Sequence, residues 1–469
     1  MPTTAPEPAG YSGSLSRSTL VYLPADILEQ IFQLLRSAWV TDIYASTPLR
    51  FDYELFQGEY LLPLSTSCRI MRAQTLPYIF RELYNWDSSR GTVWPQSLWP
   101  YCKIVHIRDR TVRTAMKLDI SEQTIHALSA MPFLVKVTLR FESSIPSRIL
   151  HALSLSPSLL HLEIYQARVD GEPLPFSLTF PALETLIIST AGFLSVVDQD
   201  EVDRDKQSSN IHSLLAVLGS RLREIRISGD LISPAFPTIE WKHLQKLVIT
   251  EHTPTPYVAV PDIVANMPAL RDLQVLYTAP VSHNFPDLPT SRISPVLHLG
   301  STTCSTLSDT CPLLSSVTLG NLLPGDSIFA QLPATLSSLR LRAPVDPYND
   351  NMGFPEYAHY PLNQDTLPRA LDHMRHLHDL REFCIDLDFF VTASLIQAIG
   401  STLPQIEVLE FNIPRYQFIA SPHRFNKNDR DPAILLALNL FSNLRHLRTT
   451  MNFMRFFDDP HYSREVTAQ

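Results

Sequence analysis

Glycine and charged residues are scarce in this sequence. Only 13 of the 469 residues are glycine, whereas 38 are proline, so turns depend mainly on a residue that stiffens the chain without supplying a positive φ. Charged residues make up 18% of the chain and the net charge is −9. This acidic balance argues against general nucleic-acid binding. The length favours two or more domains or a repeat array over one compact core.

Paired cysteines and long apolar runs are also missing. The five cysteines are scattered and never in C-x-x-C spacing, namely Cys68, Cys102, Cys304, Cys311 and Cys384. This pattern indicates a reducing compartment rather than a disulfide framework. No apolar run reaches the roughly 18 residues of a membrane span, and residues 1–19 lack the apolar core of a signal peptide. We therefore expect a cytoplasmic or nuclear protein, with no membrane partner and a disordered tail at residues 1–19.

Catalytic signatures are absent as well. The sequence contains no G-x-S-x-G, Walker A, G-x-G-x-x-G or H-E-x-x-H motif. The nearest approach to a metal site is Asp372, His373, His376 and His378, where His373 and His376 would be three residues apart on a helix. A solvated helix end explains that cluster more simply. We therefore predict a protein that is not an enzyme and uses neither a cofactor nor a metal.

The most informative segment is residues 23–35, LPADILEQIFQLL. Its apolar residues recur at spacings of one, three, one and three, which places them on one stripe of a helix. Pro24 suits the first turn of that helix. After an aromatic stretch at residues 36–58, helical spacing resumes from Leu61 to Cys68, and the segment LPYIFRELY follows at Leu76–Tyr84.

This arrangement resembles the F-box of fungal proteins over residues 20–84, with an enlarged loop between the first two helices. The resemblance implies docking on a Skp-type adaptor of a cullin–RING ubiquitin ligase. The apolar residues that match the box form the implied docking set: Leu23, Pro24, Ile27, Leu28, Ile31, Phe32, Leu35, Leu61, Leu62, Leu64 and Cys68. A competing interpretation makes these helices a hydrophobic cap on a repeat scaffold.

An L-x-x-L-x-L template recurs through the remaining chain. It begins at Leu134, Leu159, Leu183, Leu222, Leu244, Leu270, Leu314, Leu336, Leu380 and Ile406, with weaker matches at Cys102 and Leu444 and a degenerate one at Ser294. The short steps between matches fall near the ~20–29 residues of a leucine-rich repeat. Helical patterns at Ile211–Gly219 and Ser394–Gly400 lie between predicted strands.

This pattern predicts an α/β fold: a small helical module followed by a solenoid of strand–helix units with a parallel sheet, over residues 95–455, and a tail at 456–469. It resembles the irregular leucine-rich repeats that follow a fungal F-box, although the Asn or Cys ladder of the regular repeat is missing. An ordinary α/β domain with parallel strands is the alternative. Residues 198–210 are expected to form a disordered acidic loop.

Alternation along the strands places polar side chains on the concave side of the solenoid. A mixed polar surface of this kind is typical of protein binding, although solvated strand residues would look the same. The predicted substrate-binding residues are Arg108, Lys136, Arg140, Tyr165, Arg226, Arg340 and Arg342, together with Tyr348, Phe354 and Tyr357 in an insertion at 346–365. For that insertion, a lid packed on the solenoid is favoured over a substrate-binding loop. A basic insertion at 415–431 is a similar candidate.

The sequence thus predicts a substrate-recognition adaptor of a Skp–cullin–F-box ubiquitin ligase that binds an unknown protein substrate. The alternatives are a repeat scaffold without a ligase role and an enzyme built on an α/β array.

Overall fold

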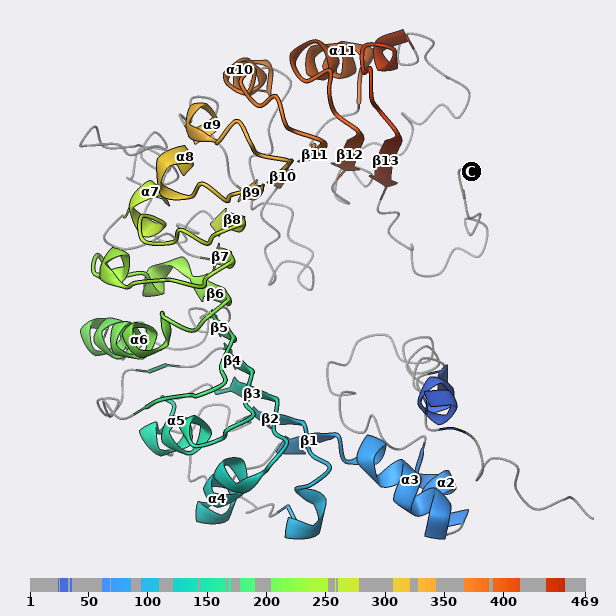
Figure 1. The fold of residues 1–469 in the computed structure, drawn as a ribbon, viewed down its shortest axis with the longest axis vertical. Coiled ribbons are helices and arrows are strands. Elements are labelled where there is room, and N and C mark those ends of the chain that lie inside the picture. The colour runs from blue at the N-terminus through green and yellow to red at the C-terminus, as the bar shows by residue number, and fades with distance from the viewer. Residues whose placement is uncertain are drawn as a thin grey trace, which may run out of the picture.

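The computed structural model describes a curved solenoid preceded by a small helical module (Figure 1). The described residues are 24, 26–32, 34–35, 61–67, 69–85, 94–108, 121–141, 144–165, 168–169, 178–189, 204–251, 258, 260–277, 307–320, 328–342, 367–387, 391–413 and 436–451. The predictions for residues 1–19, 36–58, 346–365, 415–431 and 456–469 lie outside them. Among the described residues, no helix is both long and apolar enough to cross a membrane.

One parallel sheet of 13 strands runs through the described part of the solenoid, and its spatial order follows the sequence order. The strands are β1 (Glu82–Asn85), β2 (Ile104–Arg108), β3 (Lys136–Arg140), β4 (His161–Tyr165), β5 (Thr185–Ser189), β6 (Glu224–Ser228), β7 (Lys246–Glu251), β8 (Asp272–Tyr277), β9 (Ser316–Gly320), β10 (Ser338–Arg342), β11 (Glu382–Asp386), β12 (Val408–Ile413) and β13 (His446–Met451). This nearest-neighbour order is the topology of a solenoid and not that of an ordinary α/β domain with parallel strands, the alternative drawn from the sequence.

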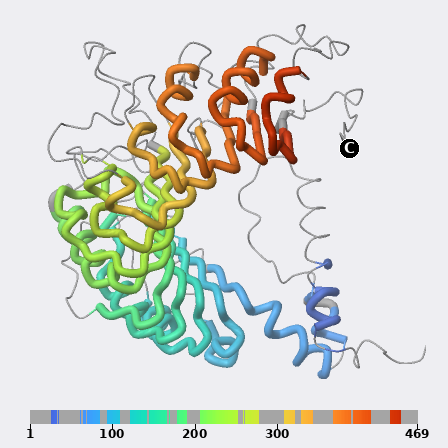
Figure 2. The backbone as a smooth tube through the Cα atoms, turned by 45° about the horizontal axis from the view of Figure 1, so that its top comes forward, coloured from blue at the N-terminus to red at the C-terminus, as the bar shows by residue number. Residues whose placement is uncertain are grey.

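Helices cover the outer side of the arc and the strands line its inner side (Figures 1 and 2). The helical module contains the helical residues 26–32 and 34–35, α2 (Leu62–Ser67) and α3 (Arg69–Ile79). The solenoid helices are α4 (Glu122–Ala130), α5 (Ser147–Ser154), α6 (Arg204–Leu218), α7 (Val260–Ile263), α8 (Leu307–Thr310), α9 (Ile328–Gln331), α10 (Leu367–His373) and α11 (Ala393–Thr402). Several are single turns, so the connection between strands varies from repeat to repeat.

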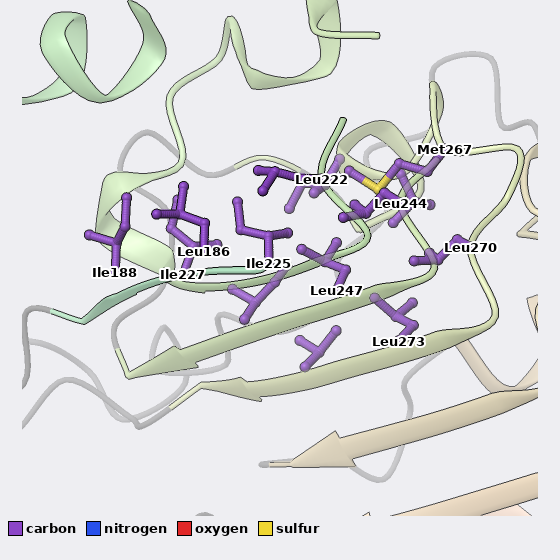
Figure 3. Close-up of a cluster of buried hydrophobic side chains, with 14 of the residues drawn as sticks. Leu186, Ile188, Leu222, Ile225, Ile227, Leu244, Leu247, Met267, Leu270 and Leu273 are labelled. Carbon is purple, nitrogen blue, oxygen red and sulfur yellow. The ribbon is translucent and has the colours of Figure 1, made fainter. Parts of the chain in front are cut away.

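The template residues of β2 to β12 form the core, as predicted, whereas Leu447 of the weaker match in β13 is 43% exposed. In β7, Leu247 and Ile249 are fully buried and stack in register between Ile225 and Ile227 of β6 and Leu273 and Val275 of β8 (Figure 3). Burying each such side chain contributes about 1.5–3 kcal/mol. Because every layer contacts only the layers beside it, the core is a continuous apolar column and no repeat could bury its own apolar face alone.

The structure corrects three sequence predictions about the fold. β1 lies within the range assigned to the helical module, so the sheet begins at Glu82 rather than after residue 95. α6 begins at Arg204, so residues 204–210 are helical rather than a disordered loop. β8 pairs directly with β9, so the sheet has no strand between them; the degenerate unit at Ser294 lies outside the described residues.

Candidate functional site

The helical module has a small core of its own. Pro24 precedes the first helix, whose described residues begin at Asp26, and the carbonyl oxygen of Pro24 accepts a 3.1 Å hydrogen bond from the amide of Leu28. Leu28 and Phe32 are buried against Leu61, and the ring of Phe32 meets Tyr78 edge-on at 4.8 Å between centroids. Burial, and next the charge of Glu29, raises the pKa of Tyr78. This cluster is separate from the core of the solenoid.

The apolar stripe of the first helix is wider than that core requires. At about 100° per residue, Leu34, Ile27, Ile31 and Leu35 fall within about 100° of the helix circumference, beside the buried pair. Ile27 is 37% exposed, Leu35 39% and Leu34 70%, whereas Ile31 is half-buried. We call Ile27, Leu34 and Leu35 the exposed stripe. Apolar side chains gathered on one exposed face indicate an interaction surface.

The predicted docking residues therefore occupy different environments. Pro24, Ile27 and Leu35 are exposed, and Ile31 and Leu64 are half-buried. Leu28, Phe32 and Leu61 are buried in the core of the module, so the prediction that they contact a partner is corrected: they stabilise the module instead. Leu62 lies in α2 with no described side chain, and Leu23 and Cys68 lie outside the described residues.

Leu34, the most exposed residue of the stripe, is not among the docking residues predicted from the sequence. Its signal was present, because Ile27, Ile31 and Leu34 are spaced by four and three residues and share one helical face.

The inner side of the solenoid carries three rows of mostly polar or small side chains, which we call the concave face. One row runs in register from Tyr84 through His106, Thr138 and Glu163 toward Arg226 and Arg340. Tyr84 stacks on His106 with ring centroids 4.5 Å apart. Along each strand these residues alternate with the buried template residues, as predicted.

Many carboxylates of the concave face already have partners. Glu163 pairs with Lys136 at 2.8 Å and accepts a hydrogen bond from Thr138; Glu224 pairs with Lys246 at 2.8 Å. Near the C-terminal end, Asp386 accepts a 2.8 Å hydrogen bond from Asn412, and Glu410 pairs with Arg448 at 3.9 Å. These contacts hold the carboxylates of the concave face against side chains of neighbouring strands.

Three of the predicted substrate-binding arginines have no ion-pair partner within the described part of the chain. Arg226 on β6 and both Arg340 and Arg342 on β10 are exposed on the concave face. Lys136 is paired, and Arg108 and Arg140 are half-buried and engaged in other interactions. Tyr348, Phe354 and Tyr357 lie outside the described residues.

A strained residue marks the end of β7. Glu251 has a φ of 66°, in the left-handed region that residues other than glycine rarely adopt, and it is buried. Its carboxylate accepts a 2.5 Å hydrogen bond from Ser189 on β5. Burial raises the pKa of the half-buried Tyr165, and Glu163 raises it further, while Arg226 opposes them and Glu251 adds to the rise. No local sequence pattern distinguished Glu251.

The described cysteines and histidines show ordinary structural roles. Burial raises the pKa of Cys102 and Cys384 to about 12 and that of Cys311 to about 11, so these thiols stay protonated near neutral pH. His376 lies beyond the end of α10, and its Nε2 is 2.9 Å from the carbonyl oxygen of Leu332. The prediction that His373 and His376 share a helix is therefore wrong.

The chain has weak similarity to known proteins. No protein-family model and no curated protein matches the sequence. One similar solved structure is the Rad7 and Elc1 complex in yeast, at 14% identity and a TM-score of 0.31, with 67% of this chain and 77% of that chain covered. Another is the mouse RP105/MD-1 complex, at 12% identity and a TM-score of 0.26, with 71% and 59% covered. Similarities at this level carry no functional argument.

Proposed function

We propose that the protein is a substrate-recognition adaptor of a Skp–cullin–F-box ubiquitin ligase, acting in the cytoplasm or nucleus. The helical module would dock on a Skp-type adaptor linked to a cullin–RING ligase, and the concave face would bind a protein substrate. The protein itself would perform no chemistry. It would raise the effective concentration of substrate lysines near a ligase-bound ubiquitin carrier. The proposal includes neither nucleic acid nor a membrane as a partner.

The exposed stripe carries this proposal. A helix that lays its apolar face into a partner groove presents anchors at spacings of three, four and seven residues. On the first helix, Leu34 follows Ile27 by seven residues and Leu35 follows Leu34 by one, and Ile31 lies between Ile27 and Leu34. The three residues of the exposed stripe remain accessible although the module buries Leu28 and Phe32 on the same helix. The module is thus folded on one side of this helix and open to a partner on the other.

A double substitution on the stripe tests the proposal. Ile27→Asp with Leu34→Asp places two charges where apolar contact is required, and we expect at least a tenfold loss of co-purified Skp-type adaptor. The matched control is Leu155→Asp, because the exposure of Leu155, 57%, lies between those of Ile27 and Leu34 and the residue belongs to the solenoid. Adaptor recovery at the wild-type level from the double variant would refute the proposal.

A repeat scaffold without a ligase role is the second candidate. In that case the helical module would only cap the first repeat, and its removal would expose apolar surface and reduce solubility. The separate core of Leu28, Phe32 and Leu61 favours an independent module instead. Deleting residues 1–79, which leaves β1 and the residue packed on the solenoid, Phe80, in place, distinguishes the two: a docking module can be removed with the solenoid still soluble, whereas a cap cannot.

A further inference from the structure

The unpaired arginines of the concave face lie in one register. The strand pairing aligns Arg226 with Val248, Gln274, Thr318 and then Arg340 across β6 to β10. Arg342 stands one position further along the inner side of β10, two residues from Arg340. Arg226 therefore lies at the β6 end of this row, Arg340 lies at its β10 end, and Arg342 lies beside Arg340.

The strands between these arginines carry no charge in the two rows concerned. The intervening side chains on β7, β8 and β9 are small, apolar or amide-bearing: Val248, Thr250, Gln274, Leu276, Thr318 and Gly320. Gln274 and Leu276 are half-buried and the other four are buried, whereas all three arginines are exposed. Exposed guanidinium groups thus stand at both ends of an uncharged band.

Neighbouring acids do not neutralise the three arginines by direct pairing. Asp386, on the strand beside β10, is held by Asn412 of β12, on its other side. Glu163 is held by Lys136 and Thr138, and Glu251 by Ser189. No ion-pair partner within 4 Å is found for Arg226, Arg340 or Arg342 in the described ranges. Fully charged donors without a partner favour an anionic ligand.

The spacing of the arginines sets the size of that ligand. Four strand-to-strand steps of about 4.8 Å place Arg226 and Arg340 about 19 Å apart across the sheet. An extended chain covers this distance with about six residues. The half-buried Gln274 and Leu276 between them offer an amide and an apolar side chain to a segment that crosses the band, and neither carries a charge.

We propose that the concave face binds an extended acidic segment of a protein partner across β6 to β10. The segment carries one acidic group at the Arg226 end, two at the Arg340 and Arg342 end, and about six residues between them with an uncharged middle. The acidic groups are carboxylates or phosphorylated hydroxyls, which share the same recognition by guanidinium. This inference rests on the proposed function only in taking the partner to be a substrate for ubiquitination.

Selection from peptide libraries tests the spacing. The probe is a library of peptides of about twelve residues in which one acid and an acid pair are separated by varied numbers of randomised uncharged residues. A second library carries phosphoserine in place of the acids. With the full-length protein we expect enrichment, in at least one library, of peptides in which about six uncharged residues separate the acid from the acid pair. The library that is enriched identifies the anion as a carboxylate or a phosphorylated hydroxyl. Enrichment of no separation in either library overturns the proposal.

Substitutions locate the contact. Arg226→Gln and Arg340→Gln should each weaken the selected peptide about tenfold, as loss of a well-placed interface arginine does. Arg448→Gln is the matched control, because Arg448 lies on the same face but pairs with Glu410; it should change affinity little. Circular dichroism melting confirms that each variant is folded. Equal affinity in all variants, or tighter arginine-dependent binding of a single-stranded oligonucleotide, refutes the proposal.

The same variants separate this inference from the proposed function. Adaptor recovery should be unchanged in Arg226→Gln and Arg340→Gln, because the exposed stripe is on another module. Peptide selection without any adaptor binding by the wild type would leave the acidic-segment site standing and remove the ligase role. Adaptor binding without peptide selection would do the reverse.

Discussion

Replacing Phe32 by alanine should unfold the helical module and leave the solenoid folded. Phe32 is 2% exposed and is the largest of the three buried side chains in the module core. Truncating a buried phenylalanine costs about 3–5 kcal/mol. A core this small provides little more than that, because small domains bury a low fraction of their surface. The substitution therefore removes most of the stability of the module.

The solenoid should not respond to this change, because the two cores are distinct. Leu28, Phe32 and Leu61 form one cluster, and the column of template residues forms another. In a repeat array, stability is carried by contacts between adjacent repeats, so loss of a separate module leaves the column intact.

Hydrogen–deuterium exchange read by mass spectrometry measures both effects in one experiment. In Phe32→Ala, amides of residues 26–35 and 61–79 should lose protection, and those of β2 to β13 should keep it. Ile27→Ala is the matched control, because Ile27 lies on the same helix outside the module core and should lower protection only slightly. Loss of protection throughout the strands would refute the separation of the cores, and full protection in Phe32→Ala would refute the packing of Phe32.

Two further predictions concern the solenoid core. Gly219→Ala should destabilise the protein by about 1–3 kcal/mol in chemical denaturation, because a Cβ there would lie 2.5 Å from Ile239 Cγ2 and 3.1 Å from the carbonyl oxygen of Glu240. Gly320→Ala is the control and should be near neutral, because the nearest contact of its Cβ would be 3.4 Å. Equal losses of stability in the two variants would contradict this packing. The thiols of Cys102, Cys311 and Cys384 should resist iodoacetamide in the native protein and react after unfolding. Burial raises the pKa of each thiol to about 11 or 12, and the thiolate is the reactive form. If peptide mass spectrometry finds these cysteines alkylated in the native state at neutral pH, they are accessible and the prediction is wrong.

The strands of the solenoid could be predicted from sequence because their signal is local. Each repeat places its own apolar residues at alternating positions, and the twelve template matches all correspond to strands β2 to β13. β1 was not predicted, because only Leu83 of its four residues enters the core and the strand follows a helix without a turn signal. Its assignment depends on pairing with β2, which the sequence of β1 does not show.

Features that depend on tertiary contacts could not be predicted from the sequence. The polar start of α6 reads as a loop, yet Asn210 is buried and donates a 2.7 Å hydrogen bond to the carbonyl oxygen of Val169. The first helix was predicted correctly, but its division into a buried and an exposed part follows from how α2 and α3 pack against it. Likewise, Lys136 and Arg226 look equivalent in the sequence, and only the neighbouring strands show that one is paired and the other is not.

The two proposed surfaces are joined by a short, well-packed connection. Tyr78 and Ile79 pack against the core of the module, while the next residue, Phe80, packs against the core of the solenoid. The carbonyl oxygen of Arg81 then accepts hydrogen bonds from the amides of Lys103 and Ile104, at 2.9 and 3.0 Å, at the start of β2. The residues that make these contacts are consecutive in the sequence, so no linker lies between the two cores here. Effective concentration depends on the stiffness of the link between two binding sites. In the proposed ligase adaptor, the position of a bound substrate relative to the docked adaptor is therefore set by packing around Phe80 and not by the reach of a linker.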